Sequence, residues 1–155
     1  MTIRWHAGPL LLYPGMAMAA LFGNLFAGSP PAGLGAADGR LAACPARPNC
    51  VSSQAGDEAH RITPFTYTGT GTEAMARLAR VIAAEPGGRI VEQRTDYIYA
   101  TFQTPLMGFV DDVEFLLRPE RTIDVRSASR LGYSDLGVNR KRIEALRTAF
   151  EGSVA

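Results

Sequence analysis

Four short runs of strand-forming residues follow one another in the second half of the chain, with breaks of only three or four residues between them. The runs are Arg89 to Gln93, Tyr97 to Gln103, Gly108 to Leu117 and Thr122 to Ser127. Strands joined by so few residues pair as antiparallel neighbours, because a parallel partner needs a crossover of about a dozen residues or more. The pattern therefore predicts an antiparallel sheet at the centre of the fold.

Two helices and one further strand are predicted around these runs. Thr70 to Glu73 has the spacing of a capping box, and apolar residues at helical intervals follow it until Glu85 to Gly88 ends the helix. A second helix is predicted from about Asn139 to Phe150. Arg61 to Thr68 is rich in β-branched and aromatic residues and predicts a strand, which Pro64 restricts to an edge. The predicted fold class is α+β, a single curved antiparallel sheet in the order β-α-β-β-β-β-α with two helices on one face.

The N-terminal residues 1–27 differ in composition from the rest. Pro9 to Ala27 carries no charge and is largely apolar, which is typical of an export signal or a membrane anchor. The alternative is a buried N-terminal helix. Residues 28–40 are rich in Gly and Pro and predict a flexible linker, so that residues 41–152 form a single domain. We therefore expect a periplasmic or otherwise extracytoplasmic protein that is anchored to the membrane through residues 9–27.

The composition argues against some classes of function for this chain. The chain has 16 Lys and Arg against 15 Asp and Glu, so it lacks the strongly basic character of most nucleic-acid-binding proteins. Its two His and two Cys provide no more than the four ligands that a single tetrahedral zinc site needs. We expect no metal, no cofactor and no nucleic-acid partner.

The only two cysteines, Cys44 and Cys50, lie close together in the sequence. In an exported protein such a pair is most simply a disulfide, which would stabilise the fold by about 2 kcal/mol. Two alternatives stay open. Leu41 to Cys44 has the form of a lipoprotein cleavage box, in which Cys44 would be acylated, and the pair could also remain as thiols.

Strand pairing places one carboxylate on the core side of the sheet. A hairpin loop at Pro119 to Arg121 pairs Asp111 with Ser129 and Glu114 with Arg126, and Asp111 then points toward the helices. A buried carboxylate is costly unless it is paired and hydrogen-bonded. The natural partners lie just past the last strand and at the start of the last helix: Arg130, Asn139 and Arg140.

These polar residues form either a structural clamp between strand and helix or the polar end of a ligand cleft. Arg140 to Arg142 places three cations in the first turn of the last helix, where the helix dipole favours anions. This arrangement indicates an anionic partner, which is either internal acids or an external carboxylate, phosphate or lipid headgroup. The candidate ligand-binding residues are Asp111, Arg126, Ser129, Arg130, Asn139 and Arg140.

An enzyme is the less favoured interpretation. Ser129, Asp111 and His60 could be arranged as a hydrolase triad, but the sequence has no strained nucleophile elbow. Alternation along the strands sends four carboxylates to opposite faces of the sheet, so one cation site is not expected from Asp111, Asp112, Glu114 and Asp124. No catalytic residue is assigned.

Three blocks of the sequence resemble the family catalogued as domain of unknown function 1499. They are Cys44 to Ser53 (CPARPNCVSS), Gly108 to Phe115 (GFVDDVEF) and Arg126 to Arg142 (RSASRLGYSDLGVNRKR). The resemblance covers roughly Leu41 to Phe150. It implies an exported or membrane-tethered bacterial protein with relatives in plastids, and it carries over no catalytic or ligand-binding residue.

Three functions follow as hypotheses. The first is a non-enzymatic, membrane-tethered domain that binds a lipid or a small anionic or amphipathic ligand between sheet and helices. The second is an envelope protein-protein interaction module without a ligand cavity, and the third is an enzyme of unknown type. An apolar cavity of about 300 Å³ or more would favour the first. A solid core with Arg130 and Arg140 paired to acids would favour the second.

Overall fold

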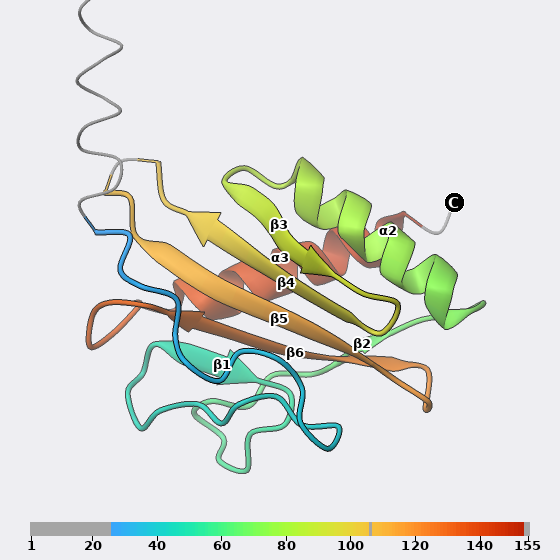
Figure 1. The fold of residues 1–155 in the computed structure, drawn as a ribbon, viewed down its shortest axis with the longest axis horizontal. Helices are drawn as coiled ribbons and strands as arrows, with labels where there is room; N and C mark the ends of the chain where they lie inside the picture. The colour runs from blue at the N-terminus through green and yellow to red at the C-terminus, as the bar shows by residue number, and fades with distance from the viewer. Residues whose placement is uncertain (1–25, 106, 154–155) are drawn as a thin grey trace, which may run out of the picture.

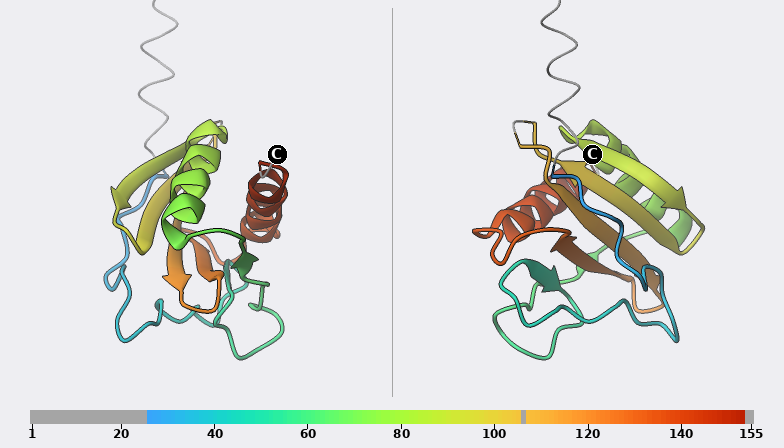
Figure 2. Two further views of the ribbon diagram at one scale, coloured as in Figure 1. Left: turned by 90° about the vertical axis from the view of Figure 1, so that its right-hand side faces the viewer. Right: turned by 60° about the vertical axis from the view of Figure 1, so that its left-hand side comes forward.

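A computed structural model describes residues 26–105 and 107–153 of the chain. Six strands form one antiparallel sheet, in which β3, β4, β5 and β6 are successive neighbours and both β1 and β2 pair with β6 (Figure 1). The strands are β1 (Cys50–Ser52), β2 (Phe65–Thr66), β3 (Gly88–Gln93), β4 (Tyr97–Gln103), β5 (Val110–Arg118) and β6 (Thr122–Ser129). The helices α2 (Gly71–Ala84) and α3 (Val138–Gly152) cover one face of the sheet (Figure 2).

The fold class and most elements agree with the sequence-based predictions. The α+β architecture, with one antiparallel sheet and two helices on one face, is confirmed. β5 and β6 pair in the predicted register, in which Asp111 lies opposite Ser129. The capping box is also confirmed: the Thr70 hydroxyl accepts from the Glu73 N–H, and the Glu73 carboxylate accepts from the Thr70 N–H.

The strands before α2 differ from the prediction. β1 was not expected, because three residues beside a proline-rich loop are too few to show the alternation of a strand. The strand predicted over Arg61 to Thr68 is reduced to the two residues of β2. Pro64 has no N–H to donate to the ladder, and ahead of it the Ile62 N–H donates to the Ser52 carbonyl instead. The element order is therefore β-β-α-β-β-β-β-α.

The hydrophobic core lies between the sheet and the two helices. Three aromatic rings from β2, β5 and α3 pack edge-to-face at its centre, with Phe65 5.6 Å from Phe115 and 5.7 Å from Phe150. Apolar stripes of the helices complete it: Met75, Leu78 and Ile82 from α2, and Ile143, Leu146 and Phe150 from α3. The predicted helical periodicity therefore corresponds to the buried faces.

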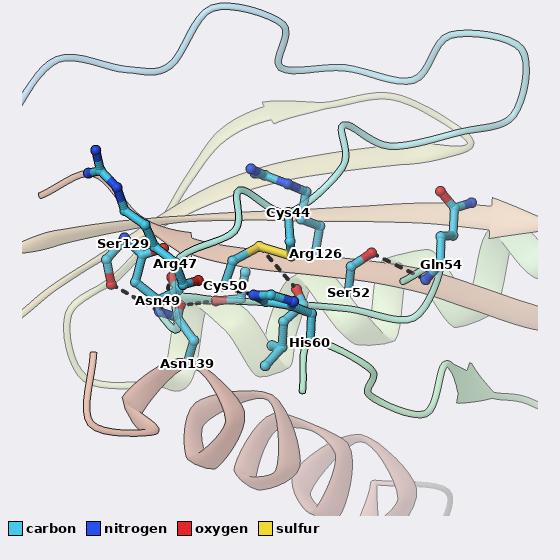
Figure 3. Close-up of a disulfide and its surroundings, with 12 residues drawn as sticks. Cys44, Arg47, Asn49, Cys50, Ser52, Gln54, His60, Arg126, Ser129 and Asn139 are labelled. Carbon is cyan, nitrogen blue, oxygen red and sulfur yellow. Dashed lines mark hydrogen bonds between the residues drawn. A yellow bond between two sulfur atoms is a disulfide. The ribbon is translucent and has the colours of Figure 1, made fainter. Parts of the chain in front are cut away.

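Cys44 and Cys50 form a disulfide whose Cα atoms lie 5.7 Å apart (Figure 3). The favoured interpretation of the cysteine pair is thus confirmed, and the described residues contain no free cysteine. The disulfide closes the loop that leads directly into β1, so it fixes the strand that pairs with the end of β6.

A long segment runs across the outer face of the sheet, which is the face opposite the helices (Figure 2). We call residues 26–41 the outer-face strap. The Gly35 N–H donates to Glu114 Oε1 at 2.8 Å, and Arg118 donates to the Gly39 carbonyl at 2.8 Å. Leu41 is buried in a small apolar cluster on this face together with Tyr97, Tyr99 and Leu116. The strap therefore covers a face of the sheet that carries aromatic and charged side chains.

Residues 1–25 hold most of the expected anchor segment and lie outside the described residues. Within the described residues, no helix is both long enough and apolar enough to cross a bilayer.

Candidate functional site

Asp111 lies on the helix-facing side of β5 and is buried, as its register predicts. Its Oδ1 accepts a hydrogen bond from the Ser129 hydroxyl at 2.5 Å, and its Oδ2 forms an ion pair with Arg142 at 2.7 Å. The arginine that compensates Asp111 is therefore Arg142, and the predicted pairing with Arg130 or Arg140 is wrong.

Arg140 points to a different side of α3. Its guanidinium donates to the carbonyl oxygens of Arg61 at 2.8 Å and Ala59 at 3.0 Å. Residues two positions apart on a helix lie on nearly opposite sides, so Arg140 turns away when Arg142 faces the sheet. Arg140 thus fastens the loop before β2 to α3 and takes no part in the cluster around Asp111.

Asn139 is the centre of a buried hydrogen-bond network at the start of α3 (Figure 3). Its Nδ2 donates to Asp135 Oδ2 at 2.8 Å, to Ser129 Oγ at 3.0 Å and to the Asn49 carbonyl at 3.3 Å. Its Oδ1 accepts from the Ser127 hydroxyl. One side chain therefore ties the helix to β6 and to the residue that precedes β1.

Asp135 caps α3 from the preceding loop. Its carboxylate accepts the N–H groups of Gly137 and Asn139, each at 2.9 Å. Burial by itself raises the pKa of Asp135, but the hydrogen bonds from Asn139 and Gly137 outweigh it and hold the pKa below its ordinary value. The start of the helix therefore has a fixed negative charge, as the helix dipole favours.

A pocket of about 230 Å³ opens beside this network, between the β4–β5 loop and the loop from β6 to α3. Its apolar walls include Phe109, Leu131, Leu136 and Val138, and its polar side includes Asp111, Ser129 and Asp135. Sites for whole small molecules are usually about 300 Å³ or larger. The pocket therefore suits one end of a ligand, with hydrogen-bond donors facing its carboxylates.

Arg130 lies on the outer face and pairs with Asp112. Its Nε donates to both Asp112 oxygens at 2.9 and 3.1 Å, and its Nη2 donates to Oδ1 at 2.8 Å. The Tyr99 hydroxyl donates to the same Oδ1 at 2.6 Å. Burial, followed by the hydrogen bond to Asp112, raises the pKa of Tyr99 to about 12, and the hydrogen bonds to Asp112 raise the pKa of Arg130. The three side chains therefore form a closed hydrogen-bonded unit on the outer face.

A second unit of the same composition lies beside it. Glu114, opposite Arg126 as predicted, accepts from the Tyr97 hydroxyl and the Gly35 N–H, each at 2.8 Å. Arg126 Nη1 lies 3.4 Å from Glu114 Oε2, and Arg126 Nε is buried with no hydrogen-bond partner among the described residues. Burial and then the charge of Glu114 raise the pKa of Tyr97 far above its ordinary value. The strap therefore lies over a face with two acid-arginine pairs, in which Asp112, Glu114 and Arg126 are buried.

The six candidate residues thus divide between different parts of the fold. Asp111, Ser129 and Asn139 meet on the helix face, and Arg126 and Arg130 lie on the outer face. Arg140 contacts the loop before β2. The outer-face cluster of Tyr97, Tyr99, Asp112 and Glu114 was not predicted from the sequence. The alternation of side chains along β4 and β5 could have placed these four residues on one face of the sheet. It gave no reason to expect that another segment covers that face.

The hydrolase triad considered from the sequence is not assembled. His60 contacts the Asp57 carboxylate at 2.7 Å and the Arg47 carbonyl at 3.0 Å, rather than Asp111 or Ser129. Within residues 26–105 and 107–153, no three His, Cys, Asp or Glu side chains gather in a way that could hold a metal ion.

His60 is expected to titrate above the ordinary histidine pKa of 6.5. Only the doubly protonated ring can donate to the Arg47 carbonyl and the Asp57 carboxylate together, and these two bonds, in that order, raise the pKa. The stability from the charged ring is present below the unfolded pKa and is lost as pH rises through the folded one. We expect an NMR midpoint for His60 above 6.5, lowered by Asp57→Asn. A midpoint at or below 6.5 in the unaltered chain would contradict this.

Comparison with known proteins adds one finding. A family model described as "Protein of unknown function (DUF1499)" matches residues 40–150, which is more than half of the chain. Neither the curated proteins nor the solved structures contain a significant match.

Proposed function

The chain belongs to the DUF1499 family of proteins of unknown function, and from this premise we propose that it is an exported, membrane-tethered, non-enzymatic domain that binds one end of a small amphipathic ligand such as a lipid. The family description names no activity, so the support comes from the surface and the pockets of this chain.

The observation that carries the proposal is a concentration of exposed apolar side chains at one end of the sheet. Of the six large apolar side chains exposed among the described residues, five lie in the β4–β5 loop or between β6 and the first residue of α3. They are Met107, Leu131, Tyr133, Leu136 and Val138. We call this surface the apolar end. Exposed apolar clusters mark interaction sites, because solvent-facing surfaces of monomers rarely concentrate such residues.

The strap begins at the same end (Figure 1). The ring of Phe26 stacks on Phe109, with centroids 5.1 Å apart, and Phe109 also lines the pocket. The charge-free segment of residues 9–27 therefore joins the domain beside the apolar end. An anchor there would hold the apolar end against the bilayer, and the disulfide is consistent with an oxidising extracytoplasmic compartment.

The charges in the pocket limit the kind of ligand that it can bind. Asp111 and Asp135 present carboxylates, and Arg142 is already paired with Asp111. An anionic group would be repelled by the unmatched charge of Asp135. The pocket therefore favours an apolar chain end that carries a hydroxyl or ammonium group, and the anionic ligand expected from the sequence is not proposed for this pocket.

Filling the pocket is expected to abolish ligand binding. Val138 lies on its wall and is partly exposed, so Val138→Trp places a large ring in the opening with little strain on the core. Native mass spectrometry of the full chain released from mild detergent should show a co-purifying lipid mass that disappears in this variant. The matched control is Ala149→Trp, which adds the same ring at an exposed position near the other end of α3.

A bare protein mass in the unaltered chain, or an adduct that persists in Val138→Trp, would count against ligand binding. The remaining candidate would then be an envelope interaction module. The same exposed residues, Tyr133 and Leu136 above all, favour it as the second function, because aromatic and apolar side chains dominate protein interfaces.

A further inference from the structure

A second pocket, of about 380 Å³, opens on the opposite face of the sheet. It lies between the start of the strap and strands β3 and β4, next to the apolar end. Ala27 and Pro30 of the strap form one side, and β3 and β4 contribute Arg89, Thr101 and Gln103. Arg130 closes the pocket from the end of β6. The pocket is thus built from segments that are far apart in the chain, and it carries two arginines.

Arg130 is held rigidly at one side of this pocket. Its side chain is 10% exposed, and its Nε and Nη2 are directed at Asp112 and Tyr99. Among the described residues, the remaining nitrogen, Nη1, has two long contacts of 3.4 Å, to the carbonyl oxygens of Ala27 and Gly28. Contacts of this length are weak hydrogen bonds. Nη1 is therefore a hydrogen-bond donor that is already fixed in position and makes only weak hydrogen bonds with the described residues.

Two further donors face the pocket without protein partners. Arg89 and Thr101 lie directly opposite each other in the β3–β4 ladder, so their side chains share the outer face. Within residues 26–105 and 107–153, neither the Arg89 guanidinium nor the Thr101 hydroxyl makes a hydrogen bond or ion pair. The pocket therefore gathers a guanidinium and a hydroxyl that a ligand could engage.

The charge balance of the pocket is positive. Asp112 is the acid next to Thr101 across the β4–β5 ladder, and Arg130 already matches its charge in a three-bond pairing. Arg89 is then the uncompensated charge. Arginine forks bind tetrahedral oxyanions well, because their donors match pairs of oxygen atoms.

We infer that this outer-face pocket binds a phosphate group, held by Arg89, Thr101 and Arg130 Nη1. The inference goes beyond the proposed function, because the pocket lies on the other face of the sheet and takes an anion that the first pocket disfavours. The phosphate belongs either to an anionic phospholipid headgroup or to a soluble phosphate. The position next to the apolar end places the arginines at the depth where headgroups would meet a docked domain.

The test uses the full chain in neutral detergent micelles. Binding is measured from the shift in Tm on adding phosphatidylglycerol, phosphatidylcholine or inorganic phosphate. We expect phosphatidylglycerol or inorganic phosphate to bind, and Arg89→Ala to weaken that binding at least about tenfold, as loss of a charged hydrogen bond does. Thr101→Val should weaken it less. Arg80→Ala removes an equal charge from an exposed position on α2 and is the matched control.

The outcomes distinguish a lipid headgroup from a soluble phosphate, and they distinguish phosphate binding in this pocket from lipid binding in the first pocket. Arg89-dependent binding of phosphatidylglycerol alone identifies a lipid headgroup, and Arg89-dependent binding of inorganic phosphate identifies a soluble phosphate. Binding that is equal in Arg89→Ala and Arg80→Ala, or no binding of either anion, overturns the inference. Val138→Trp should leave Arg89-dependent binding intact, so failure of the first pocket and failure of this one give different results.

Discussion

Replacing Arg130 with alanine is expected to lower the free energy of unfolding by about 3–5 kcal/mol, the usual effect of removing one partner from a buried ion pair. Asp112 is 1% exposed, and Arg130 satisfies both of its oxygens. Without the guanidinium, the one side-chain partner left to this carboxylate among the described residues is the Tyr99 hydroxyl. The strap would also lose the contacts of Arg130 with the carbonyl oxygens of residues 27 and 28. Urea unfolding followed by circular dichroism measures the change.

Two further variants keep this prediction testable if Arg130→Ala fails to fold. Tyr99→Phe removes the hydroxyl that donates to Asp112 and accepts from Arg130 Nη2, and it should lower stability by about 1–2 kcal/mol. The double variant Arg130→Met with Asp112→Leu removes both charges and should recover most of the loss, because no charge is then left buried. Arg80→Ala, at an exposed site, should stay within about 0.5 kcal/mol of the unaltered chain. A loss below about 1 kcal/mol for Arg130→Ala would show that Asp112 finds another partner.

Asn139→Ala is expected to lower the free energy of unfolding by about 3 kcal/mol. The buried Ser127 hydroxyl loses its acceptor, which costs about 1–3 kcal/mol, and the Asn49 carbonyl keeps the Ser129 N–H but loses the amide of Asn139. The Asp135 carboxylate keeps its backbone bonds but loses the amide of Asn139. The start of α3 and the residues before β1 are therefore expected to loosen together.

Hydrogen exchange distinguishes this network from a general loss of stability. The Ser129 N–H donates to the Asn49 carbonyl, so its exchange should accelerate in Asn139→Ala more than that of amides in the β4–β5 ladder. Lys141→Ala, at an exposed position two residues further along α3, is the control and should leave both rates unchanged. Equal acceleration of exchange at the Ser129 amide and in the β4–β5 ladder would contradict the proposal that Asn139 acts locally, by linking α3 to β6 and to the residue before β1.

The central sheet was predictable because its signals are local. The short breaks between strands require antiparallel neighbours, and the loop after β5 allows only one register that keeps the apolar residues together. That register correctly placed Asp111 toward the helices and Glu114 opposite Arg126. The partner of Asp111 was predicted wrongly, because the rotation of α3 about its own axis decides whether Arg140 or Arg142 faces the sheet. The packing of Ile143 and Leu146 into the core sets that rotation.

The outer face was not predictable in the same way. Nothing in the composition of residues 26–41 indicates that they lie on a sheet, since Gly and Pro carry little apolar surface and no periodicity. Their contacts join residues far apart in the chain, such as Gly35 with Glu114. The stabilisation comes from the partner surface, where Tyr97, Tyr99 and two acid-arginine pairs need a cover.

The sequence by itself determined the fold class, the strand register, the capping box of α2 and the burial of Asp111, since each follows from the spacing of residues near one another in the chain. Only the tertiary structure decided which arginine neutralises which acid, where the exposed apolar residues gather, and that the two pockets lie on opposite faces. The physical reason is that a side chain's partner depends on how separate elements are rotated and docked. That docking minimises buried, uncompensated charge across the whole molecule rather than within any one segment.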